Sequence, residues 1–240
     1  MSRIVDFHSH VLPGIDDGSS SLEESLSLLA LEAKQGIRHV VATPHFYARH
    51  DRPERFLADR AAAESALRGA MRSHGELPGL TVGAEVHFFS GMSNSDLLEG
   101  LTIGGKRCIL IEMPDSPWTD SMYRELENIS VRRGLIPVVA HVDRYISPFR
   151  TFGIPDRLAE LPVLVQANAS FFLRAGTRSL ALKLLRQDRI HLLGSDCHNL
   201  TVRPPRLGEA VDVIRNRLGD EALARIEYYQ RELLWNEDCI

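Results

Sequence analysis

Short apolar runs alternate with longer amphipathic stretches along most of the chain. The runs are rich in β-branched residues and largely free of charge, a pattern typical of parallel strands that are covered on both faces. Seven such runs are Ile4 to Phe7, Ile37 to Ala42, Leu80 to Ala84, Cys108 to Ile111, Leu135 to Ala140, Val163 to Ala167 and Ile190 to Gly194. This alternation predicts strands joined by helical crossovers in a parallel sheet.

The stretches between the runs show helical spacing and helix-end signals. In the first stretch, Ser21 and Glu24 occupy capping-box positions and Gly36 follows as a stop. In the second, Pro53 falls in the first turn. The predicted helices are Ser21 to Gln35, Pro53 to Ser73, Trp118 to Arg133, Thr177 to Gln187, Pro205 to Leu218 and Asp220 to Leu233. Seven strands alternating with helices favour the α/β class and a distorted (β/α)7 barrel, with a doubly wound open sheet as the alternative.

Length and composition narrow the class of protein further. A chain of 240 residues fits one large domain that needs no disulfides, and its three cysteines form no CxxC pair. The formal net charge of -4 argues against nucleic acid as a partner. No apolar run reaches the length of a membrane span, and the first residues are too polar for a signal peptide. We therefore expect a cytoplasmic globular protein without membrane insertion.

A polar residue suited to chemistry follows each predicted strand. These residues are His8 with His10, His45, Glu85, Glu112, His141, Asn168, and Asp196 with His198. Because the carboxyl ends of parallel strands converge on one face, we expect these side chains to meet there. Buried acids and imidazoles are unstable unless something satisfies them, and metal ions do so economically. Imidazole and carboxylate ligands without thiolate suit Mn, Fe, Zn or Mg.

The turn after the first strand contains two adjacent aspartates. Asp16 and Asp17 stand between a Pro-Gly pair and Gly18, in a segment with strong turn signals. We expect one of them to fold back toward the metals and the other to serve the turn alone.

The motifs HSHxLPGIDDGS, ATPH, GAEVHF, LIEMP, HVDRY and SDCHN resemble the polymerase-and-histidinol-phosphatase (PHP) superfamily. More narrowly, they are similar to its bacterial manganese-dependent protein-tyrosine phosphatases, which are encoded in capsule and exopolysaccharide operons. The similarity runs in order from Val5 to about Pro205. It implies a single PHP phosphatase domain over residues 1–240 and the TIM-like distorted (β/α)7 barrel of that superfamily. There are two departures, Cys197 in place of a usual methionine and Asp143 in place of a usual glutamate.

The resemblance also implies a site for three divalent metal ions. Manganese is the expected metal, with iron, zinc and magnesium as alternatives. One ion would be held by His8, His10, Glu112 and Asp196, a second by Glu85, Glu112 and His141, and a third by Asp17, His45 and His198. In this arrangement Glu112 bridges the first two ions. Asp17, rather than Asp16, matches the family's ligand.

The same resemblance assigns the catalytic roles. Arg144 and Arg203 match arginines that bind phosphate, and the fork of a guanidinium can hold two phosphate oxygens. Two close metals can generate a bridging hydroxide that attacks phosphorus in line. The leaving group could take its proton from a metal-bound water, His45 or His198.

Cys197 and Arg203 have the C-x5-R spacing of cysteine-dependent phosphatases. The residues between them include no glycine that would let backbone amides surround a phosphate. Because side chains alternate along an extended segment, Asp196 and His198 should share a face while Cys197 points away. We therefore interpret Cys197 as a packing residue.

The leading hypothesis is a phosphomonoesterase that acts on phosphotyrosine in a protein. The resemblance implies, as substrate, the cytoplasmic domain of an autophosphorylating tyrosine kinase that controls polysaccharide export. One rival is a small-molecule phosphatase such as histidinol phosphatase. Another is a metal-dependent amidohydrolase, which often uses a carbamylated lysine, but none of Lys34, Lys106 and Lys183 ends a strand. A metal-bound regulatory module without turnover is the non-enzymatic alternative.

Overall fold

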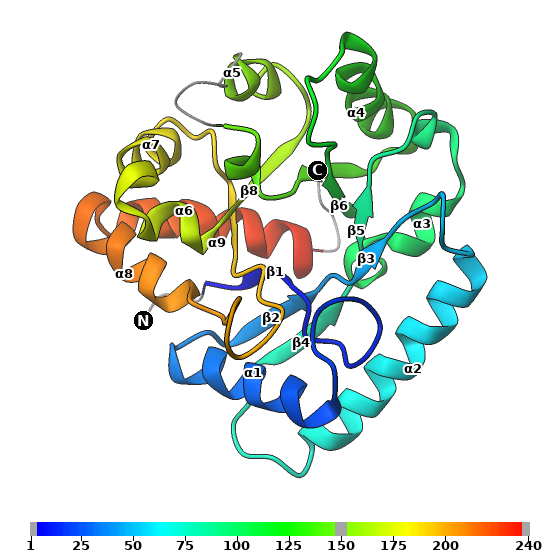
Figure 1. Ribbon diagram of the computed structural model, residues 1–240. Helices are drawn as coiled ribbons and strands as arrows, with labels where there is room; N and C mark the ends of the chain where they lie inside the picture. Colours follow the sequence, from blue (N-terminus) through cyan, green and yellow to red (C-terminus); the bar gives the residue numbers. More distant parts are fainter. Residues whose placement is uncertain (1–3, 147–152, 237–240) are drawn as a thin grey trace.

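The computed structural model of the chain describes residues 4–146 and 153–236. Its strands are all parallel and form a curved sheet with the longer helices on the outside (Figure 1). The strand segments are β1 (Asp6–Ser9), β2 (His39–Ala42), β3 (His45–Phe46), β4 (Gly79–Val82), β5 (Glu85–His87), β6 (Cys108–Glu112), β7 (Ile136–Val139), β8 (Leu164–Asn168) and β9 (Leu192–Gly194). Seven of these segments fall on the seven predicted runs. The other two, β3 and β5, lie just beyond the runs Ile37 to Ala42 and Leu80 to Ala84 and were not predicted; each continues its strand after a short interruption.

The interruptions lie at neighbouring points of the sheet. Thr43 and Pro44 separate β2 from β3, and the proline has no N–H for a ladder hydrogen bond. Gly83 separates β4 from β5 where a Cβ atom would lie 2.7 Å from Ile103 Cγ1. Strand β2 pairs with β4 and β3 pairs with β5, so the pairing continues past both breaks. His45 and Glu85 are the first residues of the segments that follow the two breaks.

The last strand returns to the first. The Asp196 amide donates to His8 O at 2.8 Å, and the His10 amide donates to Cys197 O at 2.9 Å. Ser9 and Cys197 form a parallel bridge next to these hydrogen bonds. The sheet therefore curls round on itself, which confirms the distorted (β/α)7 barrel over the doubly wound open sheet.

All six predicted helices are present, with ends that differ by at most two residues. The helices are α1 (Leu22–Lys34), α2 (Pro53–Met71), α3 (Leu97–Leu101), α4 (Asp120–Arg133), α5 (Ile154–Leu158), α6 (Ala169–Leu173), α7 (Ala175–Arg186), α8 (Leu207–Leu218) and α9 (Asp220–Leu234). Single 3-10 turns are η1 (Met92–Asn94), η2 (Ile103–Gly105) and η3 (Val142–Arg144). The sequence did not predict α3, α5 and α6, because elements this short show no helical period.

The start of α1 shows how the local sequence sets a helix end. Ser21 caps the helix, and its Oγ accepts from the Glu24 amide at 3.2 Å. The Glu24 carboxylate accepts from the amide of Ser20 at 2.9 Å, one residue earlier than in a capping box. Gly36 follows the helix with φ of 84°, a conformation that favours glycine.

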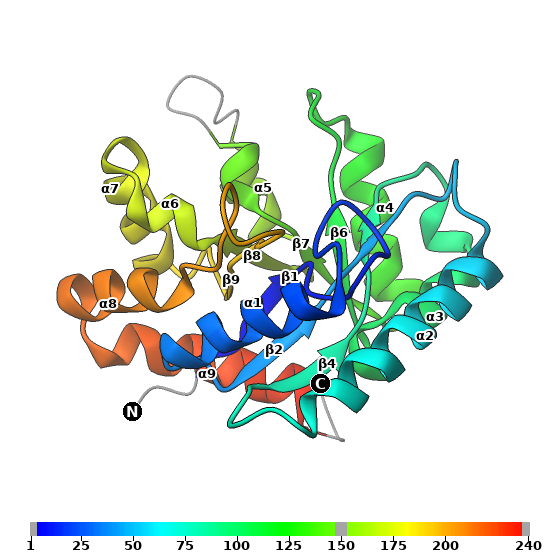
Figure 2. The ribbon, with the colours of Figure 1, turned by 60° about the horizontal axis from the view of Figure 1, so that its bottom comes forward.

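The buried apolar side chains form two layers. The smaller cluster fills the barrel interior and includes Phe7, Val41, Leu110, Val138 and Leu192. Leu233 and Leu234 of α9 pack into this cluster, so α9 covers the amino end of the strands (Figure 2). The larger cluster lies between the strands and the outer helices. Within the described residues, no helix combines the length and apolar character needed to cross a bilayer.

Candidate metal centre

The carboxyl ends of the strands bring the predicted ligands together. The residues come from the ends of β1, β6, β7 and β9, from the starts of β3 and β5, and from the loop that follows β1. Among these residues, His8, His10, Glu85, His141 and Asp196 are almost completely buried. A concentration of buried imidazoles and carboxylates is unusual in a protein core and indicates a bound cation.

Four ligand atoms of the first group face one another. Nε2 of His8 and Nε2 of His10 lie 3.2 Å apart. Glu85 Oε2 lies 3.2 Å from the first nitrogen and 3.3 Å from the second. Asp196 Oδ1 lies 3.6 and 3.5 Å from the same two nitrogens. The group therefore offers two nitrogen and two oxygen ligands around one point.

The second group shares Glu85 with the first. The other oxygen of Glu85, Oε1, lies 2.7 Å from Nε2 of His141. Glu112 Oε1 lies 3.5 Å from the same nitrogen. The resemblance gave the bridging role to Glu112. In the structure, Glu85 contacts both groups, whereas Glu112 pairs with His141, His87 and Arg144.

The third group lies on the outer side of His10. Asp17 Oδ1 lies 3.5 Å from Nε2 of His45 and 3.4 Å from Nε2 of His198. The ring of His10 lies 3.9 Å from that of His198 and 4.5 Å from that of His45, measured between centroids. Ligand atoms of these four residues lie within 4.8 Å of one another. Asp17 is the exposed member, which leaves this group open to solvent.

Several buried atoms that face the centre have no hydrogen-bond partner among the described residues. They are His45 Nδ1, Glu85 Oε2, Asp196 Oδ1 and His198 Nε2, of which the first two lie 3.0 Å apart without hydrogen-bond geometry. Leaving such atoms unsatisfied is unfavourable by roughly 1–3 kcal/mol each. All of them can donate a lone pair to a cation, and oxygen with imidazole nitrogen is the donor set of Mn, Fe and Zn sites. The residues present therefore fit a divalent metal cluster.

Hydrogen bonds behind the histidines direct their Nε2 atoms toward this cluster. His10 Nδ1 lies 2.7 Å from Asp16 Oδ2, and His8 Nδ1 lies 3.2 Å from Gln166 Oε1. His198 Nδ1 lies 3.0 Å from the carbonyl oxygen of Asp196. A ring nitrogen that donates on one side leaves the other free to bind a metal. Asp16 also accepts from the amides of Gly18 and His45, so it joins the turn to the site.

The protonation of these groups follows from their contacts. Burial would lower the pKa of His10, but the nearby carboxylates of Asp16 and Glu85 outweigh that effect and raise it to about 10. Burial would raise the pKa of Asp16, but the contact with His10 lowers it to about 2. Burial, with the charge of His10, lowers the pKa of His198 to about 4. His198 is therefore neutral near pH 7, the state in which an imidazole binds metal.

Two arginines reach the edge of the centre, as the sequence predicted. Arg144 Nη1 lies 2.8 Å from Glu112 Oε1, and its Nη2 lies 3.3 Å from Asp196 Oδ2. Arg203 Nη2 lies 2.8 Å from the same oxygen of Asp196. Both side chains are partly exposed, so they can turn toward an anion that enters from solvent.

Backbone strain is found at the same place. His141 has φ of 31° and Asp196 has φ of 53°, which are conformations that non-glycine residues rarely adopt. Each residue lies two positions after a strand, and its side chain contacts other ligands of the site. Such strain persists only where the surrounding structure enforces it, and it is often found at functional sites.

Cys197 lies on the far side of this loop. Its side chain is fully buried in the outer apolar layer, and burial raises the pKa of its thiol well above the usual range. Asp6 and Glu32 lie beside it. A buried neutral thiol is a poor nucleophile, so the structure supports packing and not a cysteine-dependent mechanism.

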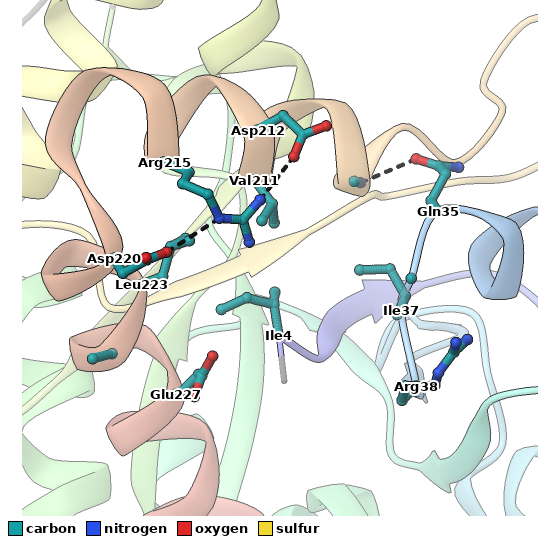
Figure 3. Close-up of a pocket in the computed structure, with 13 residues that line it drawn as sticks. Ile4, Gln35, Ile37, Arg38, Val211, Asp212, Arg215, Asp220, Leu223 and Glu227 are labelled. Carbon is teal, nitrogen blue, oxygen red and sulfur yellow. Dashed lines mark hydrogen bonds and ion pairs between the residues drawn. The ribbon is translucent and has the colours of Figure 1, made fainter. Parts of the chain in front are cut away.

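A cavity of about 900 Å³ lies at the amino ends of the strands, opposite the ligand groups. Figure 3 shows Ile4 and Ile37 in its wall, and both residues precede the strands β1 and β2. Arg215 in its rim is paired with Asp212 at 2.8 Å and with Asp220 at 3.1 Å. It contains none of the predicted ligands, so we place the candidate site at the carboxyl ends of the strands.

Comparison with known proteins agrees with this placement. Residues 4–234 match the family described as capsular polysaccharide synthesis, CpsB/CapC. The chain belongs to the CpsB/CapC family. The tyrosine-protein phosphatase CpsB of Streptococcus agalactiae serotype III (strain NEM316) is 30% identical over 229 residues, which cover 91% of this chain and 92% of that protein. The tyrosine-protein phosphatase YwqE of Bacillus subtilis (strain 168) is 28% identical over 232 residues, which cover 91% and 86%.

The fold of this CpsB/CapC protein is also that of solved structures. A crystal structure from work on YwqE from Bacillus subtilis and CpsB from Streptococcus pneumoniae, described as unique metal-dependent tyrosine phosphatases, superposes with a TM-score of 0.86. The two chains are 24% identical, and the match covers 99% of this chain and 96% of the other. This likeness shows a shared fold.

The sequence analysis of this CpsB/CapC protein did not identify Gln166, whose hydrogen bonds position the histidine ligands. Gln166 holds His8 and also accepts from the His141 amide at 2.6 Å. Its Nε2 donates to Asn168 at 3.0 Å, and Asn168 in turn donates to Asp196 at 2.9 Å. Gln166 stands inside an apolar run, and a polar residue at such a position was the signal that could have identified it.

Proposed function

We propose that this chain, as a single PHP phosphatase domain, is a metal-dependent protein-tyrosine phosphatase. One observation supports the proposal most directly. Arg144 and Arg203 both contact Oδ2 of Asp196. The other oxygen of this carboxylate, Oδ1, belongs to the first ligand group. A phosphate that replaces this contact would touch both guanidinium groups and the metal ligands at once. The CpsB/CapC relatives named tyrosine-protein phosphatases support phosphotyrosine as the substrate.

The three ligand groups suit as many as three divalent cations, and we propose manganese. His8, His10, Glu85 and Asp196 would hold one ion. Glu85, Glu112 and His141 would hold the second, while Asp17, His45 and His198, with His10 beside them, would hold the third. Bound divalent cations would lower the pKa of water and offset the charge of the phosphoryl oxygens.

The protein's own residues bind and orient the phosphate. Arg144 and Arg203 approach Asp196 from different loops, so they can grip different oxygens of one phosphoryl group. The developing negative charge then lies in a site already lined by cations, which needs little reorganisation. His198 Nε2 lies 3.4 Å from Asp17 Oδ1, an arrangement that supports a role as a metal ligand. The leaving group would take its proton from a water molecule, His45 or His198, and both histidines belong to the group that is open to solvent.

The family match supports a proposal for the biological setting. The description of the CpsB/CapC family, capsular polysaccharide synthesis, supports a role in that process. We propose that the substrate is a phosphotyrosine protein, the cytoplasmic domain of a bacterial tyrosine kinase that regulates capsule or exopolysaccharide synthesis. The enzyme would then act in the cytoplasm.

The test compares substrates and metals in one assay. Purified protein is incubated with Mn²⁺ or with EDTA, and phosphate release is measured from a phosphotyrosyl peptide, its phosphoseryl counterpart and histidinol phosphate. We expect Mn²⁺-dependent release from the phosphotyrosyl peptide. Equal activity in EDTA would exclude the metal mechanism, and activity confined to histidinol phosphate would favour a small-molecule phosphatase.

Two histidine variants make the assignment specific. His10→Ala removes a ligand nitrogen, and we expect loss of turnover and of bound metal. His74→Ala is the matched control, because His74 is exposed at the end of α2 and contacts Ala70 O. Full activity of His10→Ala would contradict the site.

A further inference from the structure

A second cavity adjoins the metal centre on the side of β3 and β5. Its volume is about 560 Å³. We call it the aromatic groove, and its walls are Tyr47, His87, Phe88, Phe89, Pro114 and Met122. These residues come from the loops after β3, β5 and β6 and from the first turn of α4, which lie on the same side of the barrel (Figure 1).

The inner wall of the groove touches the metal ligands. The ring of Tyr47 lies 5.4 Å from that of His45 and 5.4 Å from that of His87, measured between centroids. His87 Nδ1 lies 3.0 Å from Glu112 Oε2. The groove and the metal centre therefore share one wall, and a ligand can occupy both at once.

The rest of the groove is apolar. Phe88 is nearly buried, and Phe89 and Met122 pack partly against the main core. Pro114 completes this surface. Arg49 and His50 are exposed and supply the polar rim. An apolar cavity with a polar rim suits a flat hydrophobic group whose far end remains in solvent.

Hydrogen bonds fix the loops that form the groove. The amides of Gly91 and Ser93 donate to the Glu125 carboxylate of α4 at 3.1 and 3.0 Å. The Tyr47 amide donates to Asp51 at 2.6 Å. A groove that is already formed needs little ordering when it binds a ligand.

The opposite side of the metal centre has a different chemistry. There the lining of a cavity of about 460 Å³ includes four arginines and two carboxylates, namely Arg144, Arg174, Arg203 and Arg206 with Asp143 and Asp196. That side suits anions, whereas the aromatic groove suits an apolar ring. The two sides together match a phosphate joined to an aromatic group.

We propose that the aromatic groove binds the aromatic ring of the phosphorylated side chain, with Tyr47 and Phe89 as its specificity-determining residues. The inference rests on the proposed phosphatase function and names the feature of the substrate that this enzyme selects. An aryl ring in the groove can pack against Tyr47 at the centroid separations that aromatic pairs adopt. A phosphoserine side chain has no group that reaches the groove, so it gains only the contacts of its phosphate.

The first experiment measures binding without turnover. Phenylphosphonate and methylphosphonate are titrated into the Mn²⁺-loaded protein by calorimetry. We expect phenylphosphonate to bind about tenfold more tightly, the effect of one aromatic contact. This preference should fall to about twofold or less in Tyr47→Ala and in Phe89→Ala. Tyr47→Phe keeps the ring and should retain it.

The second experiment measures selectivity in catalysis. The ratio of kcat/KM for phenyl phosphate to that for ethyl phosphate is determined for the same variants. We expect the ratio to fall in Tyr47→Ala through KM for the aryl ester. Val131→Ala is the control, because Val131 is an apolar residue of α4 that is 72% exposed outside the groove. Thermal unfolding and metal content show that each variant is folded, and Phe89→Leu replaces Phe89→Ala if the latter unfolds.

The outcomes separate the two proposals. A protein that hydrolyses no phosphate ester but shows Tyr47-dependent binding of phenylphosphonate would refute the phosphatase function and keep the groove. An active enzyme whose aryl preference is unchanged in both Tyr47→Ala and Phe89→Ala would refute the groove alone. Equal affinity of the wild type for the two phosphonates would also refute it.

Discussion

Asp16 holds the imidazole of His10 in one orientation, with Oδ2 lying 2.7 Å from Nδ1. The opposite nitrogen, Nε2, then faces Glu85 and Asp196 at 3.3 and 3.5 Å. The same carboxylate accepts from the amides of Gly18 and His45, so one side chain joins the turn after β1 to two ligand groups.

We therefore predict that Asp16→Asn weakens metal binding while the fold is kept. The asparagine amide cannot hold the imidazole as a carboxylate does, and loss of such a partner typically weakens metal affinity about 10- to 100-fold. Titration of the metal-free protein with Mn²⁺ measures the change. Asp115→Asn, at an exposed position, is the control. Equal affinity of Asp16→Asn and wild type would assign Asp16 to the turn alone.

Glu85 and Glu112 should differ sharply in their importance. The two oxygens of Glu85 serve different ligand groups, whereas Glu112 contacts only the second of them. We expect Glu85→Gln to lose more bound metal than Glu112→Gln, because it disturbs both groups. Metal content after dialysis, measured by mass spectrometry, tests this order. A larger loss in Glu112→Gln would restore the bridging role that the sequence resemblance assigned to it.

The stability contributed by Glu32 should depend on pH. Burial and the neighbouring Asp6 raise the pKa of this fully buried carboxyl well above its usual range. In the unfolded chain a glutamate ionises near pH ~4.3. Above that pH the unfolded state releases a proton that the native state keeps, so the native state loses relative stability until the pH reaches the raised pKa.

Glu32→Gln cannot ionise and escapes this loss. We predict that its free energy of unfolding, relative to wild type, increases between pH 6 and pH 8 by up to ~1.4 kcal/mol per pH unit. Urea unfolding at the two pH values gives the difference. A difference that does not change with pH would show that Glu32 is ionised in the native protein.

Cys197 should be dispensable for turnover. Its thiol is buried in the outer apolar layer, away from the ligand side of the loop. We expect Cys197→Ala to keep kcat within about twofold and to lose ~1–2 kcal/mol of stability, as is usual for a small buried side chain. Steady-state kinetics and thermal unfolding measure both effects. Complete loss of turnover with normal metal content would instead indicate a cysteine nucleophile.

The sequence predicted the barrel well because its strands are recognisable locally. Continuous burial on both faces produces apolar runs, and short loops place the helices between them. The breaks at Pro44 and Gly83 were not predicted, because a strand interruption depends on what the neighbouring strand and η2 require. Helices α3, α5 and α6 were missed because five residues are too few to show a period.

The candidate ligands were predictable for a related reason. A parallel sheet sends all its carboxyl ends to one face, so the position after each run already implied that His8, Glu85, His141 and Asp196 would meet. Their partners were harder to predict. Gln166 and Asp16 contact the histidines through side chains whose directions depend on the curvature of the sheet and on the turn after β1.

The sequence by itself thus determined which chemical groups gather and at which end of the barrel they lie, because strand order and residue type are local properties. Only the tertiary structure decided that Glu85 lies between two ligand groups, that Arg144 and Arg203 share one oxygen of Asp196, and that Tyr47 and His87 border a groove. These relationships join strands and loops far apart in the chain. They depend on the curl of the sheet, the strained backbone at His141 and Asp196, and the packing of side chains that no single segment specifies.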